Sequence, residues 1–283
     1  MVDVLTVLNQ PMQIGSDTPA DVRWTGGGSA ANTACWLAAA GVDAVFVGRA
    51  GADLAGRAAL DGLTAAGVAA QVGIDDELPT GTCVVLVDHT GERTMIPSPG
   101  ANAALSAADV DAVRLDESTH LHVSGYALFG GARDAARFAI GLAHAAGATV
   151  SIGAASAGPL ATLGAHEFLT WSAGTTVFAN RDEAAVLTGL EDQSAAAFVI
   201  GSAVEAAVLT SGATGSIWSD GGEPIYADAE LVDVVDTTGA GDAFAAGYLA
   251  TWLAGGQPGA AMLEGHRLAA RACGKIGGRP TDY

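Results

Sequence analysis

Apolar runs of strand length alternate along the chain with longer runs rich in alanine and leucine. The strand candidates are Val2–Leu8, Ala44–Gly48, Thr82–Asp88, His120–Ser124, Thr149–Ile152, Thr175–Ala179, Ala206–Thr210 and Ser216–Ser219. The helix candidates are Ala30–Ala40, Ala55–Ala66, Ala132–Ala146, Asp182–Leu187, Ala195–Ser202, Ala240–Leu253 and Pro258–Ile276. The strands are continuously apolar, which is typical of parallel strands covered on both faces. This order predicts an α/β fold, with helices layered on a mainly parallel sheet.

Two segments interrupt the alternation of strands and helices. Asn9–Thr25 is polar and extended, and Gln71–Gly100 contains a hairpin pattern with a turn at His89–Glu92. Neither segment contains a predicted helix, so we expect both to leave the sheet and form a small β lid over one end of it. Such a lid could exclude water from a site. The alternative is a surface hairpin with no role in the chemistry.

The composition fits one domain of 283 residues with a large core, since half of the residues are hydrophobic and 15% are charged. The formal net charge of −19, with no basic run, is a poor match to nucleic acid or to an anionic membrane. Three distant cysteines, Cys35, Cys83 and Cys273, predict reduced thiols in a cytoplasmic protein. We expect neither a signal peptide nor a membrane span.

The stretch Asp236–Asp242 carries the strongest chemical signal. It follows the apolar run Leu231–Val235 and opens the predicted helix that continues to Leu253. Small residues at such a turn leave N–H groups exposed at the helix N-terminus, where they attract phosphate. A carboxylate in that place suits a base that deprotonates an attacking hydroxyl. An ordinary glycine-rich turn with a favourably placed aspartate fits the spacing about equally well.

A second glycine-rich string, Gly26–Asn32, lies just before the first predicted helix. Its glycines allow a ligand to approach the backbone, and Asn32 offers a donor and an acceptor for hydroxyl groups. The string also matches a loose dinucleotide-binding pattern, G-x-G-x-x-A. That pattern needs a buried apolar strand before it, and Asp21–Thr25 is not one.

Two further motifs follow predicted strands. Asn180 and Glu183 stand three residues apart at a helix start, where an amide and a carboxylate could hold hydrated Mg²⁺ beside a triphosphate. Considered alone, a helix-capping pair is the favoured interpretation. The turn Thr210–Gly215 consists of small residues that could lie against nucleotide phosphates, but alone it indicates only a turn.

Taken together, these motifs agree in order and spacing with one family. The matching segments are Gly27-Gly28-x-x-x-Asn32, Val45–Gly56, Pro99–Asn102, Asn180-x-x-Glu183, Leu209–Gly215 and Asp236–Phe244. Over almost its whole length the chain resembles the PfkB carbohydrate kinases, the ribokinase-like family. The resemblance implies a three-layer α/β/α core with a small β lid and the transfer of the γ-phosphate of ATP to a hydroxyl group of a small sugar.

The resemblance also implies a role for each matching residue. Asp242 would be the general base, and the N–H groups of Gly239, Ala240 and Gly241 would form an anion hole for the transferring phosphoryl group. The implied ligands of the substrate hydroxyls are Asp3, Gly27, Gly28 and Asn32.

Other matching positions imply contacts with the nucleotide and with metal ions. Those that would contact ATP are Asn180, Thr210, Gly212 and Gly215. Glu183 would organise Mg²⁺ through water. Asp236 and Thr238 match positions that help to hold a monovalent cation, usually K⁺.

Two positions depart from the family pattern. Only Met1 and Val2 precede Asp3, so most of the usual first strand would be missing. We therefore expect a frayed terminus that positions Asp3 poorly, with a solvated carboxylate an equal alternative. Gly153 stands where many members carry an aspartate, so contacts with the substrate or phosphate there would differ.

The sequence does not identify the substrate. Ribose-type sugars, fructose derivatives and nucleosides such as pseudouridine or adenosine all fit the family, and the small number of aromatic residues near the lid favours a sugar. The alternatives from other classes are a weak or non-catalytic sugar- or nucleotide-binding homologue and a dinucleotide-dependent oxidoreductase. Exposed lid strands also suggest a homodimer.

Overall fold

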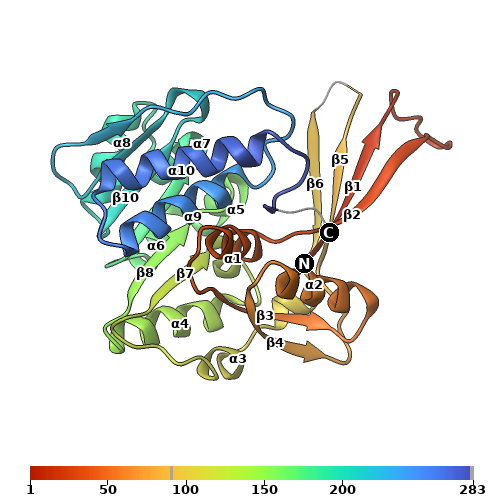
Figure 1. The fold of residues 1–283 in the computed structure, drawn as a ribbon, viewed down its shortest axis with the longest axis horizontal. Coiled ribbons are helices and arrows are strands. Elements are labelled where there is room, and N and C mark those ends of the chain that lie inside the picture. Colours follow the sequence, from red (N-terminus) through yellow and green to blue (C-terminus); the bar gives the residue numbers. More distant parts are fainter. Residues whose placement is uncertain (90–91, 281–283) are drawn as a thin grey trace.

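Six strands form the larger sheet of the computed structural model, which describes residues 1–89 and 92–280 (Figure 1). Their order is β12-β11-β10-β9-β8-β7. The bounds are β7 His120–Ser124, β8 Thr149–Gly153, β9 Thr176–Asn180, β10 Ala206–Thr210, β11 Ser216–Ser219 and β12 Ile225–Ala227. The four strands from β7 to β10 pair in parallel, and β11 and β12 add antiparallel pairs at one edge. The prediction of a mainly parallel central sheet is confirmed.

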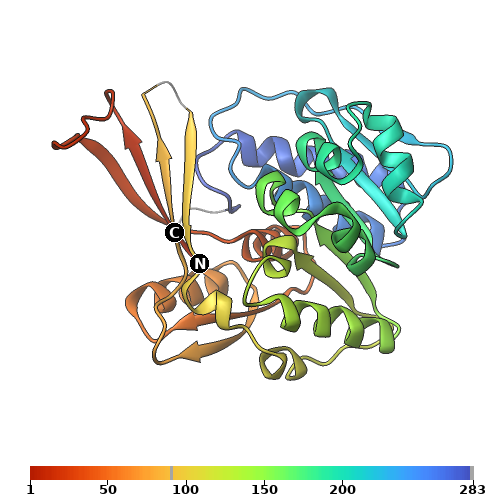
Figure 2. The same cartoon turned by 180° about the vertical axis from the view of Figure 1, so that it is seen from behind.

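Helices cover both faces of this sheet. Successive residues of a strand point to opposite sides, and both sides of these strands are apolar, so each side packs against helices. Phe178 and Val208 pack against α9 (Ala240–Leu253) and α10 (Pro258–Cys273). Their neighbours Val177 and Leu209 belong to a second apolar cluster with the helices of the other face. These helices, green to teal in Figure 2, are α4 (Arg133–Ala145), α5 (Ala157–Leu163), α6 (Ala165–Trp171), α7 (Arg181–Thr188) and α8 (Gln193–Gly201). The predicted three-layer α/β/α core is therefore present.

A second, two-stranded sheet lies beside the first. It pairs β3 (Val45–Gly51) with β4 (Ala69–Asp75) in parallel, and α2 (Leu54–Ala65) connects the two strands. Within the described residues neither strand pairs with β7. Instead α1 (Ser29–Ala39) packs against both β3 and β7, and its Trp36 is buried against α9 and α10. One helix thus joins the two sheets.

The lid is a four-stranded sheet that projects from one side of the molecule (Figures 1 and 2). Its order is β2-β1-β5-β6, with bounds β1 Val2–Leu8, β2 Ala20–Gly26, β5 Thr82–Val87 and β6 Arg93–Ser98. Strand β1 pairs along its length with β2 and β5. The frayed terminus expected at Asp3 is therefore wrong, since hydrogen bonds hold the strand on both sides.

The structure differs from the sequence interpretation at several boundaries. Residues 71–75 belong to β4 and pair with β3, and the lid sheet takes up β1. Short elements that the pattern did not predict include β12, α5, α6, α3 (Ala107–Asp111) and three 3₁₀ turns, Gly100–Ala104, Gly125–Leu128 and Gly212–Thr214. In the turn predicted at 89–92, Thr90 and Gly91 lie outside the described residues. No helix in the described part of the chain is both long and apolar enough to cross a membrane.

Candidate active site

Asp242 lies in the first turn of α9 and connects two distant motifs. Ser29 Oγ donates to its Oδ1 at 2.8 Å, and Asn32 Nδ2 donates to its Oδ2 at 2.9 Å. Both donors lie at the start of α1, more than 200 residues earlier. Sequence analysis predicted Asp242 and Asn32 but missed Ser29, although it stands inside the glycine-rich string. The bonds fix the carboxylate in one orientation.

The surroundings of Asp242 adjust its acidity. Burial raises the pKa of its carboxyl to about 6, the hydrogen bonds from Asn32 and Ser29 oppose the rise, and nearby Asp3 adds to it. A carboxylate with a pKa near neutrality is a stronger base than a solvated aspartate and is still ionised at pH 7. Asp242 is therefore suited to accept a proton from a hydroxyl group.

The pKa shift of Asp242 predicts an acid limb in the pH profile. Below about pH 6 the base is protonated, so kcat at saturating substrate should fall about tenfold per pH unit; kcat/KM also responds to Asp3, whose pKa burial raises to about 6 as well. Removing the Ser29 hydroxyl takes away a bond that favours the charged form, so Ser29→Ala should move the limb to higher pH. Initial rates from pH 5 to 9 measure this shift. In the matched control Ser202→Ala, on exposed surface after α8, the limb should stay in place.

The turn before Asp242 has the backbone geometry of an anion site. Gly239 precedes α9 with φ +74°, and a Cβ on Gly241 would meet nothing within 4 Å. Ala240 N–H already donates to Thr237 O at 3.2 Å. Among the described residues the N–H groups of Gly239 and Gly241 have no backbone partner. Of the three predicted anion-hole groups, these two are the freer to bind phosphate.

Asp3 lies against the Gly27–Gly28 backbone. A Cβ on Gly27 would stand 2.0 Å from Asp3 Oδ1, so only glycine permits this approach, and Gly28 adopts φ +91°. Met1 O accepts a hydrogen bond from Gly27 N–H at 3.2 Å. The Asp3 side chain is buried and has no hydrogen-bond partner within the described residues. It is thus a positioned acceptor with unused capacity, suited to substrate hydroxyls.

Burial also raises the pKa of Asp3 to about 6, opposed by the N-terminal amine and by Arg279. Replacement of Asp3 by asparagine keeps the shape but removes the charge. Because hydrogen bonds to charged groups contribute about 1.5–3 kcal/mol, we expect kcat/KM to fall by about one to two orders of magnitude, mainly through KM. Steady-state kinetics measure this change. An unchanged KM would place Asp3 outside the substrate site.

Arg279, which sequence analysis did not identify, orients Asn32. Its Nε donates to Asn32 Oδ1 at 3.3 Å, and its Nη2 donates to Gly27 O at 3.1 Å. With its oxygen on Arg279, the Asn32 amide presents its nitrogen to Asp242. Arg279 follows the last predicted helix by several residues, and no motif marks it, so nothing in the sequence pattern could have placed it here.

Asn180 and Glu183 form the capping pair that the sequence favoured. Glu183 N–H donates to Asn180 Oδ1 at 2.9 Å, while the Asn180 amide and N–H donate to the two Glu183 carboxylate oxygens at 2.8 and 2.9 Å. Burial raises the pKa of Glu183. Both carboxylate oxygens are engaged, so an Mg²⁺ ion would be contacted through water, as this strongly hydrated ion usually is. Among the described residues, no three His, Cys, Asp or Glu side chains could hold a metal together.

The turn Thr210–Gly215 lies beside this pair, since Thr210 and Asn180 are register partners at the carboxyl ends of β10 and β9. In open α/β sheets, ligands bind at this edge. Gly212 has φ +57° with open space around it, whereas a Cβ on Gly215 would stand 2.2 Å from Ala227 O. The turn therefore has one face open to a ligand and the other packed against β12.

Gly153 ends β8 at the same edge. A Cβ built there would meet nothing within 4 Å. Glycine supplies no carboxylate at this position, and the volume that an aspartate side chain would fill is open.

Asp236 and Thr238 stand at the entrance of the α9 turn. Thr238 contributes its backbone N–H, which donates to Asp236 Oδ1 at 2.7 Å. Asp236 Oδ2 accepts from Gly277 N–H at 2.9 Å, and Arg93 of the lid forms an ion pair with Oδ1. Sequence analysis did not predict Arg93 at the site.

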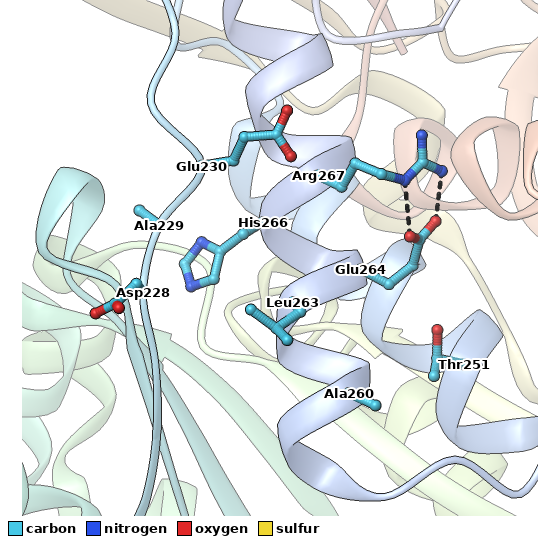
Figure 3. Close-up of a pocket in the computed structure, with 9 residues that line it drawn as sticks. All are labelled: Asp228, Ala229, Glu230, Thr251, Ala260, Leu263, Glu264, His266 and Arg267. Carbon is cyan, nitrogen blue, oxygen red and sulfur yellow. Dashed lines mark hydrogen bonds and ion pairs between the residues drawn. The ribbon is translucent and has the colours of Figure 1, made fainter.

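A groove elsewhere on the surface is separate from this constellation. It runs between α10 and the segment 228–230, where His266, Leu263 and the Arg267–Glu264 ion pair line it (Figure 3). None of the predicted site residues lines it.

Comparison with known proteins agrees with the geometry. The family model described as pfkB family carbohydrate kinase matches residues 7–282. An ATP-dependent ribose-1-phosphate kinase from Halopiger xanaduensis is 33% identical over 97% of this chain and 89% of its own length. A fructokinase from Salmonella typhimurium is 30% identical over 88% of this chain and 84% of its own. The solved structure of adenosine kinase from Sinorhizobium meliloti superposes with a TM-score of 0.86 and 29% identity, covering 99% of this chain and 93% of that one.

Proposed function

Because the chain belongs to the pfkB family of carbohydrate kinases and is an ATP-dependent sugar kinase, we propose that its substrate is a ribosyl compound phosphorylated on its primary hydroxyl. One observation carries the assignment of the site. The Asp242 carboxylate, fixed by Ser29 and Asn32, lies at the N-terminus of α9 within electrostatic reach of the buried Asp3 carboxyl.

In the proposed reaction the hydroxyl of the substrate transfers its proton to Asp242 as its oxygen attacks the γ-phosphorus, and the bond from that phosphorus to the bridging oxygen breaks so that ADP leaves. The N–H groups of Gly239 and Gly241 receive the charge of the transferring phosphoryl group. Phosphoryl transfer needs little covalent chemistry from the protein, so positioning and charge stabilisation do most of the catalysis. On the other side, Asp3, Asn32 and the Gly27–Gly28 backbone bind the remaining hydroxyl groups.

ATP enters, in this proposal, as its Mg²⁺ complex. Glu183 and Asn180 would hold the hydrated ion through water, and the open face of the 210–215 turn, with Gly212, would lie along the nucleotide. When bound, Mg²⁺ neutralises phosphate charge. The capping bonds of Asn180 and Glu183 hold this pair in place before the nucleotide arrives.

The names of the relatives support a short list of acceptor substrates. Ribose 1-phosphate and adenosine, named for the Halopiger and Sinorhizobium proteins, both contain a ribose ring substituted at C1 and a free 5-hydroxyl. Nucleosides are thus the second candidates, and the half-exposed Tyr126 beside Phe129 offers a ring face for a base. Fructose, named for the Salmonella relative, is the third.

The test is a coupled ADP-release assay with Mg²⁺-ATP against ribose, ribose 1-phosphate, adenosine and fructose. We expect one of the three ribosyl compounds to react fastest and its 5-deoxy analogue to give no ADP, since the attacking hydroxyl is then missing. Turnover with fructose alone would contradict the ribosyl assignment. Binding of all four compounds without ADP release would instead support a non-catalytic homologue.

We further propose that the whole chain is one cytoplasmic kinase domain whose lid closes over the sugar. A homodimer formed through the lid fits the exposed apolar side chains on its strands, among them Trp24, Met95 and Ile96. The net charge of −19 argues against nucleic-acid partners.

A further inference from the structure

The family resemblance implies a monovalent cation beside Asp236, and the residues present do not fit one. Both carboxylate oxygens are already occupied, Oδ1 by Thr238 N–H and the Arg93 guanidinium and Oδ2 by Gly277 N–H. The Arg93 Nη2 atom lies 2.7 Å from Oδ1, so a second cation at the same oxygen would meet an adjacent positive charge. The following loop is occupied as well, because the Lys275 ammonium donates to Arg279 O.

We propose that Arg93 supplies from the lid the positive charge that a monovalent cation would supply, and that the enzyme therefore works without K⁺. This inference rests on the proposed kinase site. Arg93 lies on β6, whereas Asp236 lies 143 residues later at the entrance of the α9 turn. The contact crosses from the lid to the core.

The geometry of the contact fits a built-in cation. One guanidinium nitrogen pairs with Asp236, and the other donates to Thr237 Oγ1 at 2.8 Å. A planar guanidinium can span two adjacent acceptors in this way, which an ammonium ion cannot do as well. The Asp236 carboxylate is buried, so water compensates its charge poorly, and removing Arg93 would leave that charge uncompensated on the lid side.

The same contact positions the anion hole. Arg93 holds Asp236 and Thr237, and Thr237 O in turn accepts from Ala240 N–H within the turn that presents Gly239 and Gly241. Arg93 is thus a positioning residue, because it acts through the turn and not on the phosphoryl group itself. The turn is fully braced only while strand β6 of the lid is in place.

The first test exchanges the monovalent cation. Wild-type rates with the best ribosyl substrate are compared in KCl, NaCl and tetramethylammonium chloride at equal ionic strength, using ATP free of K⁺ and Na⁺. We expect equal rates in all three salts. A wild-type rate that K⁺ raises several-fold would overturn the proposal. Absence of turnover in every salt would instead count against the proposed function.

The second test removes the built-in charge. In tetramethylammonium, Arg93→Ala should lose about 10- to 100-fold in kcat, less than the roughly 10²- to 10³-fold that removal of an anion-hole donor costs, and added K⁺ or guanidinium should restore much of it. Arg93→Lys should retain more activity. The matched control is Arg23→Ala on exposed strand β2, which should change nothing. A fully active Arg93→Ala, or a slow one that neither ion restores, would contradict the inference.

A third readout does not depend on activity. Thermal unfolding of the wild type should give the same Tm in K⁺ and tetramethylammonium, whereas K⁺ should raise the Tm of Arg93→Ala by binding the vacated carboxylate. Specific stabilisation of the wild type by K⁺ would show that a cation site exists beside Arg93, and would overturn the proposal even if no substrate were found.

Discussion

Replacing Asp242 by asparagine is expected to reduce kcat by about 10²- to 10⁴-fold, the usual contribution of a general base. Asparagine preserves the volume of the side chain but cannot accept a proton at neutral pH. Its oxygen can keep one of the two hydrogen bonds that now come from Ser29 and Asn32. KM for the sugar should change far less than kcat, because the lost interaction belongs to the transition state.

The control for this variant is Asp233→Asn. Asp233 is exposed and lies in the same segment before α9, so its change removes an equal charge without touching the site. Equal Tm values for the wild type and both variants would show that the fold is intact. A rate of Asp242→Asn within about threefold of the wild type, against the expected loss, would remove the general base from the mechanism.

Gly239→Ala is expected to be nearly as damaging for a different reason. Gly239 has φ +74°, a conformation that costs an L-residue about 1–3 kcal/mol, and its new Cβ would stand 2.5 Å from Gly278 Cα. The backbone must shift, and with it the N–H groups of the anion hole. We expect about 10²- to 10³-fold lower kcat together with a Tm lowered by several degrees.

Substitutions at two other glycines separate the loss of activity from the loss of stability. Gly141→Ala on α4 meets no atom within 4 Å and should leave both activity and Tm near the wild-type values. Gly241→Ala also has space for its Cβ, but that space is where the phosphoryl group is proposed to lie. It should therefore retain its Tm and lose activity. If Gly241→Ala were fully active, the proposed position of the anion hole would be wrong.

The sequence predicted the layered core well because buried parallel strands produce long apolar runs, as in β9 and β10. Edge strands were harder. Strand β2 is exposed along most of its length and β12 has three residues, so neither shows an apolar pattern. The lid was recognised from its hairpin, but β1 was assigned to the core because an apolar run does not reveal its partners.

The site was predictable where a residue belongs to a local motif. Asp242, Asn32 and the glycines had that support. Arg93, Arg279 and Ser29 act through contacts with residues 143 to 252 positions away, which only the fold brings together. The order of the strand around Asp3 was also missed. It depends on pairing of β1 with β2 and β5, which a short-range pattern cannot show.

The missing pairing between β3 and β7 has a consequence for cooperativity. Within the described residues no backbone ladder joins the lid and the β3–β4 sheet to the six-stranded sheet, so these sheets meet through side-chain contacts, chiefly Trp36 of α1 buried against α9 and α10. The proposed sugar ligands Asp3 and Gly27 lie on the lid side of this junction, and Asp242 lies on the other side, in α9. A bound substrate would add contacts across this junction, so amide exchange in the lid and the β3–β4 sheet should slow most on binding.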